Sequence, residues 1–198
     1  MKKRILITGS NGLLGQKLVE LLRQQAHVDL IATARGANRL PVTEGYTYAP
    51  LDITVQAEVN AVFDQFKPEV VIHTAAMTNV DTCETDREGC DLLNVDAVAY
   101  LIQACEKHGS YLCHLSTDFI FDGADGPYTE EGKPNPISYY GESKLKAEEL
   151  LFHSNIRWSI ARTVLVYGIV PDMSRSNIVL WVKKSLEDGK TIQVVTDQ

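Results

Sequence analysis

The sequence has no long hydrophobic run and no excess of positive charge. No apolar stretch approaches the roughly 20 residues of a membrane-spanning helix. The apolar residues that follow Arg4 end at Thr8, which is too early for a secretory signal. Lys and Arg number 19 against 26 Asp and Glu, so the formal net charge is −7 and no overall basic field would attract a polyphosphate. We therefore expect a cytoplasmic protein that binds neither a membrane nor nucleic acid.

Metal-binding and disulfide patterns are missing as well. The four cysteines are Cys83, Cys90, Cys105 and Cys113, and no two of them form a CxxC pair. The five histidines are His27, His73, His108, His114 and His153. None of these histidines has the spacing of a metal ligand, so we interpret them as structural or exposed and expect no metal site. The cysteines are expected to be reduced, structural thiols.

What the sequence does contain is an alternation of β-rich segments and amphipathic helical patterns. Its 198 residues, 44% of them hydrophobic, can bury a core of their own. Strands are predicted near residues 4–8, 30–33, 46–51, 70–73, 111–115 and 158–161. Helices are predicted between most of them, including one long helix from residue 92 to about 109 and another over 140–152. Crossover helices between parallel strands predict the α/β class, with a doubly wound parallel-sheet Rossmann domain over residues 1–168.

Two further segments differ from this alternation. Residues 122–138 are rich in glycine and proline and predict one long loop, a feature that is usually functional. Residues 169–198 predict only a helix over 178–186 and a strand over 191–195. We expect residues 169–198 to be the beginning of a smaller, truncated C-terminal substrate lobe.

A glycine-rich turn joins the first predicted strand to the first helix. Gly9, Gly12 and Gly15 follow the pattern GxxGxxG. The first glycine allows a tight turn, the second lets a pyrophosphate approach the helix N-terminus, and the third lets the helix pack closely on the sheet. A purely structural turn is the alternative, but the position between strand and helix favours a dinucleotide site. Asn11, Leu13 and Leu14 of the same turn are expected to contact the cofactor.

The end of the second predicted strand bears on which dinucleotide binds. An NAD site has an acidic residue there, whereas this chain has Arg35 and Arg39, which can clamp a 2′-phosphate. We therefore expect NADP, with NAD as the alternative if both arginines are only solvated surface residues. Asp52 and Ile53, after the third strand, are expected near the adenine. Asp52 could equally be only the N-cap of the helix that follows.

Tyr140 and Lys144 lie four residues apart on a predicted helix and so share one face. A free tyrosine has a pKa of about 10, and a nearby cation lowers that value. Lys144 and an oxidised nicotinamide ring are both positive. Together they are expected to lower the pKa of Tyr140 by about 2–3, which takes roughly 3–4 kcal/mol and makes the phenol a proton donor for a carbonyl under reduction. An exposed helix face is the alternative, and Tyr139 is interpreted as a packing residue.

Hydroxyl groups follow the fifth predicted strand, at the edge of the sheet where ligands bind. Thr117, or failing that Ser116, can donate a hydrogen bond to the carbonyl oxygen that becomes an alkoxide. Capping of the strand end is the alternative interpretation.

Taken together, these motifs resemble the extended short-chain dehydrogenase/reductase family. They are TGSNGLLG from Thr8, HTAA from His73, STDFIFDG from Ser116 and YYGESKLKAEELL from Tyr139. The last two are most similar to the dTDP-4-dehydrorhamnose reductase branch of the family. The resemblance implies a Rossmann domain that carries NADP or NAD. It also implies hydride transfer to the 4-keto group of a dTDP-deoxyhexose, the last step to dTDP-rhamnose.

The resemblance also implies roles for single residues. Thr117, Tyr140 and Lys144 match the catalytic trio of the family, and Ala75 and Ala76 match the stretch that passes the nicotinamide ribose. The implied substrate contacts are Met77, Asn94, Ser116, Thr117, Asp118 and Phe119. Phe119 stands where the family usually has tyrosine, and Met77 where an aromatic residue is common.

Two other functions stay open at this point. The first is a sugar-nucleotide epimerase or dehydratase that retains and recycles bound NAD. The second is a non-catalytic, NADP-binding regulatory subunit. We expect a sugar nucleotide as the substrate, and a homodimer as the assembly.

Overall fold

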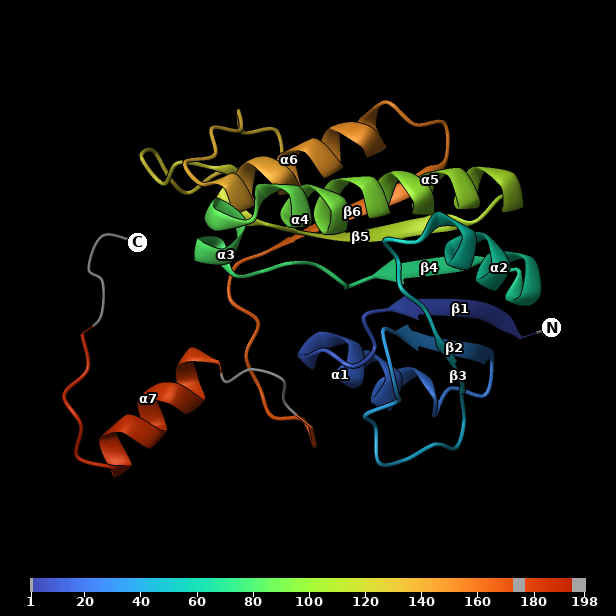
Figure 1. Cartoon of the computed structure of the whole chain (residues 1–198), viewed down its shortest axis with the longest axis horizontal. Coiled ribbons are helices and arrows are strands. Elements are labelled where there is room, and N and C mark those ends of the chain that lie inside the picture. The colour runs from blue at the N-terminus through green and yellow to red at the C-terminus, as the bar shows by residue number, and fades with distance from the viewer. Residues whose placement is uncertain (1, 173–176, 194–198) are drawn as a thin grey trace.

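The structure, a computed structural model, describes residues 2–172 and 177–193 and is built on one six-stranded parallel sheet (Figure 1). The strands are β1 (Lys3–Thr8), β2 (Val28–Ala34), β3 (Thr47–Pro50), β4 (Val70–His73), β5 (Tyr111–Thr117) and β6 (Arg157–Thr163). Their order in the sheet is β3-β2-β1-β4-β5-β6, and each neighbouring pair is parallel. This is the strand order of a Rossmann fold, so the predicted doubly wound sheet is confirmed.

Helices connect most of the strands. They are α1 (Leu13–Leu22), α2 (Gln56–Phe66), α3 (Val80–Thr85), α4 (Arg87–Asp91), α5 (Ala97–His108), α6 (Tyr139–Phe152) and α7 (Ile178–Glu187), with a π-helical turn η1 (Leu92–Asp96) and a 3₁₀ turn η2 (Asp118–Ile120). The predicted long helix from residue 92 is not one regular α-helix. Its first turn is η1, which follows directly on α4, and α5 continues from η1. A hydrophobic pattern of period 3.6 does not register a π turn, whose hydrogen bonds span five residues. The predicted end of that helix at Gly109 is confirmed by the left-handed conformation of this glycine, with φ 68°.

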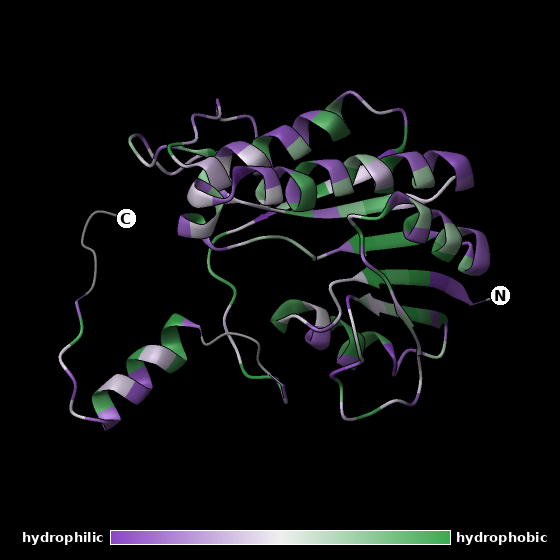
Figure 2. Ribbon diagram, viewed as in Figure 1, coloured by the Kyte–Doolittle hydropathy of each residue, from purple (hydrophilic) through white to green (hydrophobic). Residues whose placement is uncertain are grey.

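The two faces of the sheet bury different hydrophobic clusters, because successive side chains of a strand point to opposite faces. Leu6 of β1 packs in a cluster with residues of α2, α5 and α6, whereas its neighbour Ile7 packs in a second cluster with Val19 of α1. Figure 2 shows the hydrophobic residues concentrated in the strands and on the inner faces of the helices. Because β1, β4 and β5 are parallel, their carboxyl ends lie at the same edge of the sheet, and the two clusters hold the strands in place there.

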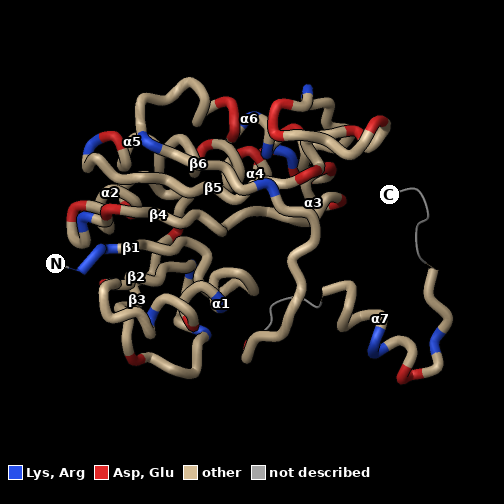
Figure 3. Tube along the Cα trace, turned by 180° about the vertical axis from the view of Figure 1, so that it is seen from behind, with Lys and Arg blue, Asp and Glu red and all other residues tan. Residues whose placement is uncertain are grey.

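Loops and charges occupy the periphery. The predicted loop over residues 122–138 contains no helix or strand, as expected. Figure 3 shows acidic and basic residues interspersed over helices and loops, while the strands are mostly uncharged. None of the helices in the described residues is both long enough and apolar enough to span a membrane.

The chain after β6 runs away from the sheet to α7, which lies apart from the other helices in Figure 1. This helix confirms the prediction over residues 178–186. The predicted strand over residues 191–195 is wrong for 191–193, which have no regular secondary structure, while 194 and 195 lie outside the described residues. The isolated β-rich run finds no neighbouring strand to pair with in the described chain, and a single strand gains no ladder hydrogen bonds on its own.

Candidate active site

The glycine turn after β1 is shaped by close backbone approaches. Gly9 has φ 73°, and a Cβ at this position would lie 2.7 Å from the backbone nitrogen of Ala75. A Cβ at Gly15 would overlap the carbonyl oxygen of Gly9. Gly12 is the N-cap of α1 and supplies no side chain to cap the first turn. The N–H groups at the start of α1 therefore keep hydrogen-bonding capacity for an anion.

Two neighbouring cavities follow the carboxyl edge of the sheet and share Gly12, Thr74 and Ala76 in their walls. The larger, of about 740 Å³, is also lined by Leu13, Leu14, Gly15, Ser116, Tyr140 and Lys144. The smaller, of about 260 Å³, is also lined by Gly9, Arg35, Asp52, Ile53 and Ala75. The shared wall joins them into one elongated site, and an elongated ligand such as a dinucleotide requires this shape.

The arginines expected near a 2′-phosphate take different positions. Arg35 is 84% exposed, and its Nη1 lies 4.0 Å from Oδ2 of Asp52 in the wall of the smaller cavity. Arg39 instead pairs with Asp172, with 3.9 Å between Nε and Oδ2. Arg35 is thus the arginine that reaches the cavity, while Arg39 connects the loop after β2 with the segment after β6.

Asn11 and Asp52 have local structural partners as well. The side chain of Asn11 donates to the carbonyl of Ala37 and accepts from the backbone N–H of Arg39, which fastens the glycine turn to the loop after β2. Asp52 accepts hydrogen bonds from the hydroxyl and the N–H of Thr54, and the hydroxyl bond is the main reason why the pKa of Asp52 is lowered. The N-cap of α2 is Val55, so the alternative interpretation of Asp52 as that cap is wrong.

Tyr140 stands at the start of α6 and is held from several sides. Ser138 caps the helix by accepting from the N–H of Gly141. The ring of Phe119 packs edge-on against the ring of Tyr140 with centroids 5.7 Å apart. Burial raises the pKa of Tyr140, and a hydrogen bond with the side chain of Thr117 opposes this rise. The phenol is therefore neutral and protonated at pH 7, the state that a proton donor needs.

The ammonium of Lys144 is held by two acceptors from β5. Lys144 is 2% exposed, and its Nζ donates to the carbonyl of Leu115 at 2.7 Å and lies 3.1 Å from Nε2 of His114. Burial lowers its own pKa to about 8. The expected lowering of the pKa of Tyr140 is not seen here, because desolvation of the phenol outweighs the groups that oppose it.

Ser116 and Thr117 are the last two residues of β5, which runs two residues further than predicted, and they lie at its carboxyl end as the sequence predicts. Thr117 donates to Oδ1 of Asp118 at 3.1 Å and accepts from the N–H of Phe119, so this threonine also forms the strand-end turn of the alternative interpretation. Ser116 lines the larger cavity, and its buried hydroxyl has no hydrogen-bond partner among the described residues. Both hydroxyls are thus placed near Tyr140, and Ser116 has free capacity.

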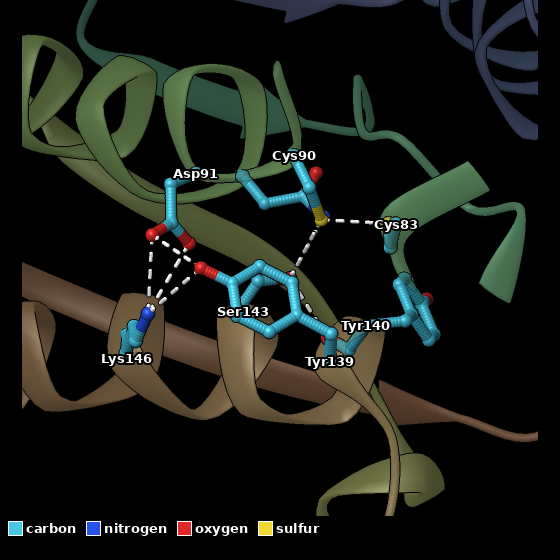
Figure 4. A network of polar contacts seen from close by, with 8 residues as sticks. Cys83, Cys90, Asp91, Tyr139, Tyr140, Ser143 and Lys146 are labelled. Carbon is cyan, nitrogen blue, oxygen red and sulfur yellow. Dashed lines mark hydrogen bonds and ion pairs between the residues drawn. The ribbon is translucent and has the colours of Figure 1, made fainter. Parts of the chain in front are cut away.

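A buried network lies beside Tyr140. Figure 4 shows its members Cys90 and Ser143, and Asn94 and Met77 join it through hydrogen bonds. Asn94 is 1% exposed; its amide accepts from the N–H of Met77 and donates to the carbonyl of Met77 and the hydroxyl of Ser143. With these partners Asn94 holds the chain after β4 in place, and the expected substrate contact of Asn94 stays a prediction. Met77 packs with Cys83 and Cys90 against Tyr140.

The cysteines and Tyr139 complete this region. All four cysteines are free thiols, as predicted, and burial raises the pKa of Cys83 to about 12, so its thiol stays protonated. Tyr139 turns away from Tyr140 in Figure 4 and donates to Asp91 at 2.7 Å beside Lys146. Tyr139 thus joins a surface polar cluster besides packing. Residues 2–172 and 177–193 contain no group of three or more His, Cys, Asp or Glu arranged for a metal ion.

Three lining or supporting residues escaped the sequence reasoning. Thr74 lines both cavities and donates to the carbonyl of Thr8, and its place within HTAA was the available signal. Thr163, at the end of β6, lines the larger cavity, and no catalytic or binding role was predicted for it. His114, interpreted from sequence as structural or exposed, is buried against Lys144.

The fold and the site define a dinucleotide-binding α/β protein with the Tyr-Lys pair of short-chain dehydrogenases/reductases. The sequence profile of the RmlD substrate binding domain family matches residues 2–198. The chain belongs to this family.

Named relatives share this organisation. The chain is 33% identical over 196 residues to dTDP-4-dehydrorhamnose reductase of Aggregatibacter actinomycetemcomitans, covering 98% of this chain and 61% of the relative. It is 33% identical over 183 residues to methionine adenosyltransferase 2 subunit beta of Xenopus tropicalis, covering 92% of this chain and 52% of the relative. The crystal structure of dTDP-4-dehydrorhamnose reductase from Bacillus anthracis in complex with NADP superposes with a TM-score of 0.76 at 30% identity, covering 95% of this chain and 61% of that one. The chain thus spans less than two thirds of each.

Proposed function

We propose that this protein reduces the 4-keto group of a nucleotide-linked deoxyhexose with NADPH, as the reductases among its relatives are named to do. The observation that carries the proposal is the convergence of Tyr140, Lys144 and Ser116 on the cavity that begins at the glycine turn. Thr117 supports it through its hydrogen bond with Tyr140. Related proteins named dTDP-4-dehydrorhamnose reductase favour a dTDP-linked sugar.

The residues present fit a dinucleotide. The uncapped first turn of α1 offers N–H groups to a pyrophosphate, and the lack of side chains at Gly9, Gly12 and Gly15 keeps the backbone accessible. Arg35 would hold a 2′-phosphate, while Asp52 and Ile53 would line the adenine end. A solved relative in complex with NADP is consistent with this choice, while another solved neighbour is in complex with NAD.

Ketone reduction requires a hydride at carbon and a proton at oxygen. NADPH, when bound, supplies the hydride. Tyr140 supplies the proton from its neutral phenol. A hydroxyl at the end of β5 holds the ketone oxygen: that of Ser116, which has no partner among the described residues, or that of Thr117 once it turns from Asp118. Lys144 binds the ribose and places a positive charge beside the tyrosinate that remains. Phe119, packed edge-on against the ring of Tyr140, helps to hold the phenol in place.

We further propose that residues 1–168 form the cofactor-binding domain and that residues 169–198 begin a substrate lobe. Val170, Asn177 and Ile178 support this division, because they line the cavity next to Tyr140. Met77, Asp118 and Phe119 are proposed on its substrate side. A homodimer and a cytoplasmic location stay predictions.

The test is the oxidation of NADPH, followed at its absorbance band, with a panel of 4-keto sugar nucleotides. We expect turnover with at least one of them. Tyr140→Phe should lose at least about a thousandfold in rate, because it removes the phenolic hydroxyl that donates the proton and leaves the ring in place. Tyr139→Phe is the matched control on the same helix, and it should keep the wild-type rate. Equal rates in wild type and Tyr140→Phe would contradict the assignment.

A regulatory subunit is the second candidate function, favoured by the likeness to methionine adenosyltransferase 2 subunit beta. It predicts NADPH binding without ketone reduction, and a stable partner protein on size-exclusion chromatography. The epimerase or dehydratase alternative predicts conversion of the sugar without stoichiometric consumption of NADPH. One assay with substrate and NADPH in known amounts therefore separates the three functions.

A further inference from the structure

A column of buried polar side chains runs beneath Lys144, from β1 to α6. Oγ1 of Thr8 lies 2.7 Å from Nδ1 of His73. The rings of His73 and His114 stack with centroids 5.2 Å apart, and Nε2 of His114 lies 3.1 Å from Nζ of Lys144. None of these four residues is more than 2% exposed. The proposed reduction uses Lys144 alone among them.

When Lys144 is charged, the hydrogen bond between Lys144 and His114 can run in only one direction. An ammonium donates hydrogen bonds and cannot accept them, so Nε2 of His114 must be the acceptor. His114 is then neutral, with its proton on Nδ1. Burial, with Lys144 and His73 nearby, holds the pKa of His114 well below its ordinary value. Nδ1 has no hydrogen-bond partner among the described residues, so the polar contact that orients this ring is the one with Lys144.

The groups that face Lys144 explain why a neutral acceptor matters. They are His114 from β5, His73 from β4, Glu148 from α6 and Cys90 from α4, and Tyr140 of α6 lines the same cavity. Glu148 is fully buried, and both of its carboxylate oxygens accept from Arg162, at 3.1 and 2.7 Å, so its charge is already paired. A carboxylate in the place of His114 would cancel the charge of the ammonium, whereas an imidazole accepts its hydrogen bond and leaves the charge intact.

We propose that His114 is a positioning residue: as a neutral acceptor it acts with the carbonyl of Leu115 to fix the ammonium of Lys144 toward the cavity. Lys144 lines that cavity, and its bonds to His114 and Leu115 occupy two of its three N–H groups. The third N–H is left for the ribose of the dinucleotide. In this last respect the inference rests on the proposed function.

The tautomer of His114 provides a test in the wild-type protein. Long-range ¹H–¹⁵N spectra of the imidazole at pH 7 are expected to show a neutral ring with its proton on Nδ1. The resonance is assigned by its absence in His114→Gln. A proton on Nε2, or a charged imidazolium, would overturn the proposal, because neither form can accept from Lys144.

The pKa of Lys144 gives the second test, read from the ¹³Cε shift of labelled lysine against pH. In the wild type we expect titration at about pH 8. In His114→Leu the ammonium loses an acceptor, so the titration is expected to move about one pH unit lower. His114→Gln, which keeps an acceptor near Nε2, should restore the wild-type midpoint. His114→Met replaces the leucine variant if that variant does not fold.

The control is His108→Leu, because His108 is the last residue of α5 and bonds with Asp64 of α2, so its loss should leave Lys144 unchanged. An identical midpoint for Lys144 in wild type, His114→Leu and His114→Gln would overturn the proposal. Neither spectrum requires turnover. If the wild type reduces no ketone, the proposed function fails, while the NMR result still decides the role of His114.

Discussion

Replacing Lys144 by methionine is expected to change how the stability of the fold depends on pH. Lys144 is 2% exposed, and burial lowers its pKa from 10.5 to about 8. The unfolded chain regains the ordinary pKa. Between about pH 8 and 10.5 the unfolded state therefore binds more protons than the folded state, and the wild type gains stability as the pH rises through this window.

The size of this effect follows from the two pKa values. Their difference of about 2.5 corresponds to about 3.5 kcal/mol, since one pKa unit is about 1.4 kcal/mol, and most of it is reached by pH 10.5, where half of the unfolded lysine is still protonated. The free energy of unfolding of the wild type minus that of Lys144→Met should thus rise by about 3 kcal/mol from pH 7 to pH 10.5. Taking the difference between the two proteins cancels the titration of the other groups, apart from those coupled to Lys144.

The assay is urea unfolding followed by tryptophan fluorescence at half-unit steps of pH. Lys146→Met is the matched control on the same helix. The side chain of Lys146 is 42% exposed and bound to Asp91, and its pKa is raised, so its difference curve should change little and in the opposite direction. A flat difference curve for Lys144→Met would refute the reasoning, because it would mean that the folded protein leaves the pKa of Lys144 at its ordinary value.

Three other variants test the cofactor site and the core. Gly15→Ala places a Cβ against the carbonyl of Gly9, so it should lower the melting temperature and weaken NADPH binding in a fluorescence titration; unchanged binding would contradict the role of the turn. Arg35→Asp should lower the preference for NADPH over NADH at least about tenfold, measured as the ratio of Kd values, because a charge-assisted contact is lost. Arg162→Met leaves the buried carboxylate of Glu148 without its partner and should cost about 3–5 kcal/mol in urea unfolding, with most of the loss recovered by adding Glu148→Gln.

The buried network around Asn94 shows how a local irregularity serves the site. The π turn η1 lies where Asn94 bonds to Met77 and Ser143, and so connects the chain after β4 to α6. Since Tyr140 stands at the start of α6, this connection contributes to the position of the phenol. A regular helix would turn residue 94 to a different angle, which explains why the irregularity falls at this point.

The sequence alone determined the fold class and the main parts of the site. Strands such as β1 and β4 are read from short β-rich runs, and the glycine spacing predicted the turn that the structure contains. The four-residue spacing of Tyr140 and Lys144 likewise placed both on α6 and both in the wall of one cavity. These features are local: they depend on residues a few positions apart, and their spacing is visible in the sequence.

Only the tertiary structure decided which partners those residues meet. That Arg35 reaches the cavity while Arg39 pairs with Asp172, and that Lys144 bonds to His114, depends on segments far apart in the chain. The pKa of a buried group depends on desolvation and on every neighbour, so the direction for Tyr140 could not be read from the spacing of one lysine. Spacing fixes which residues share a face, whereas burial and long-range contacts fix the chemistry of that face.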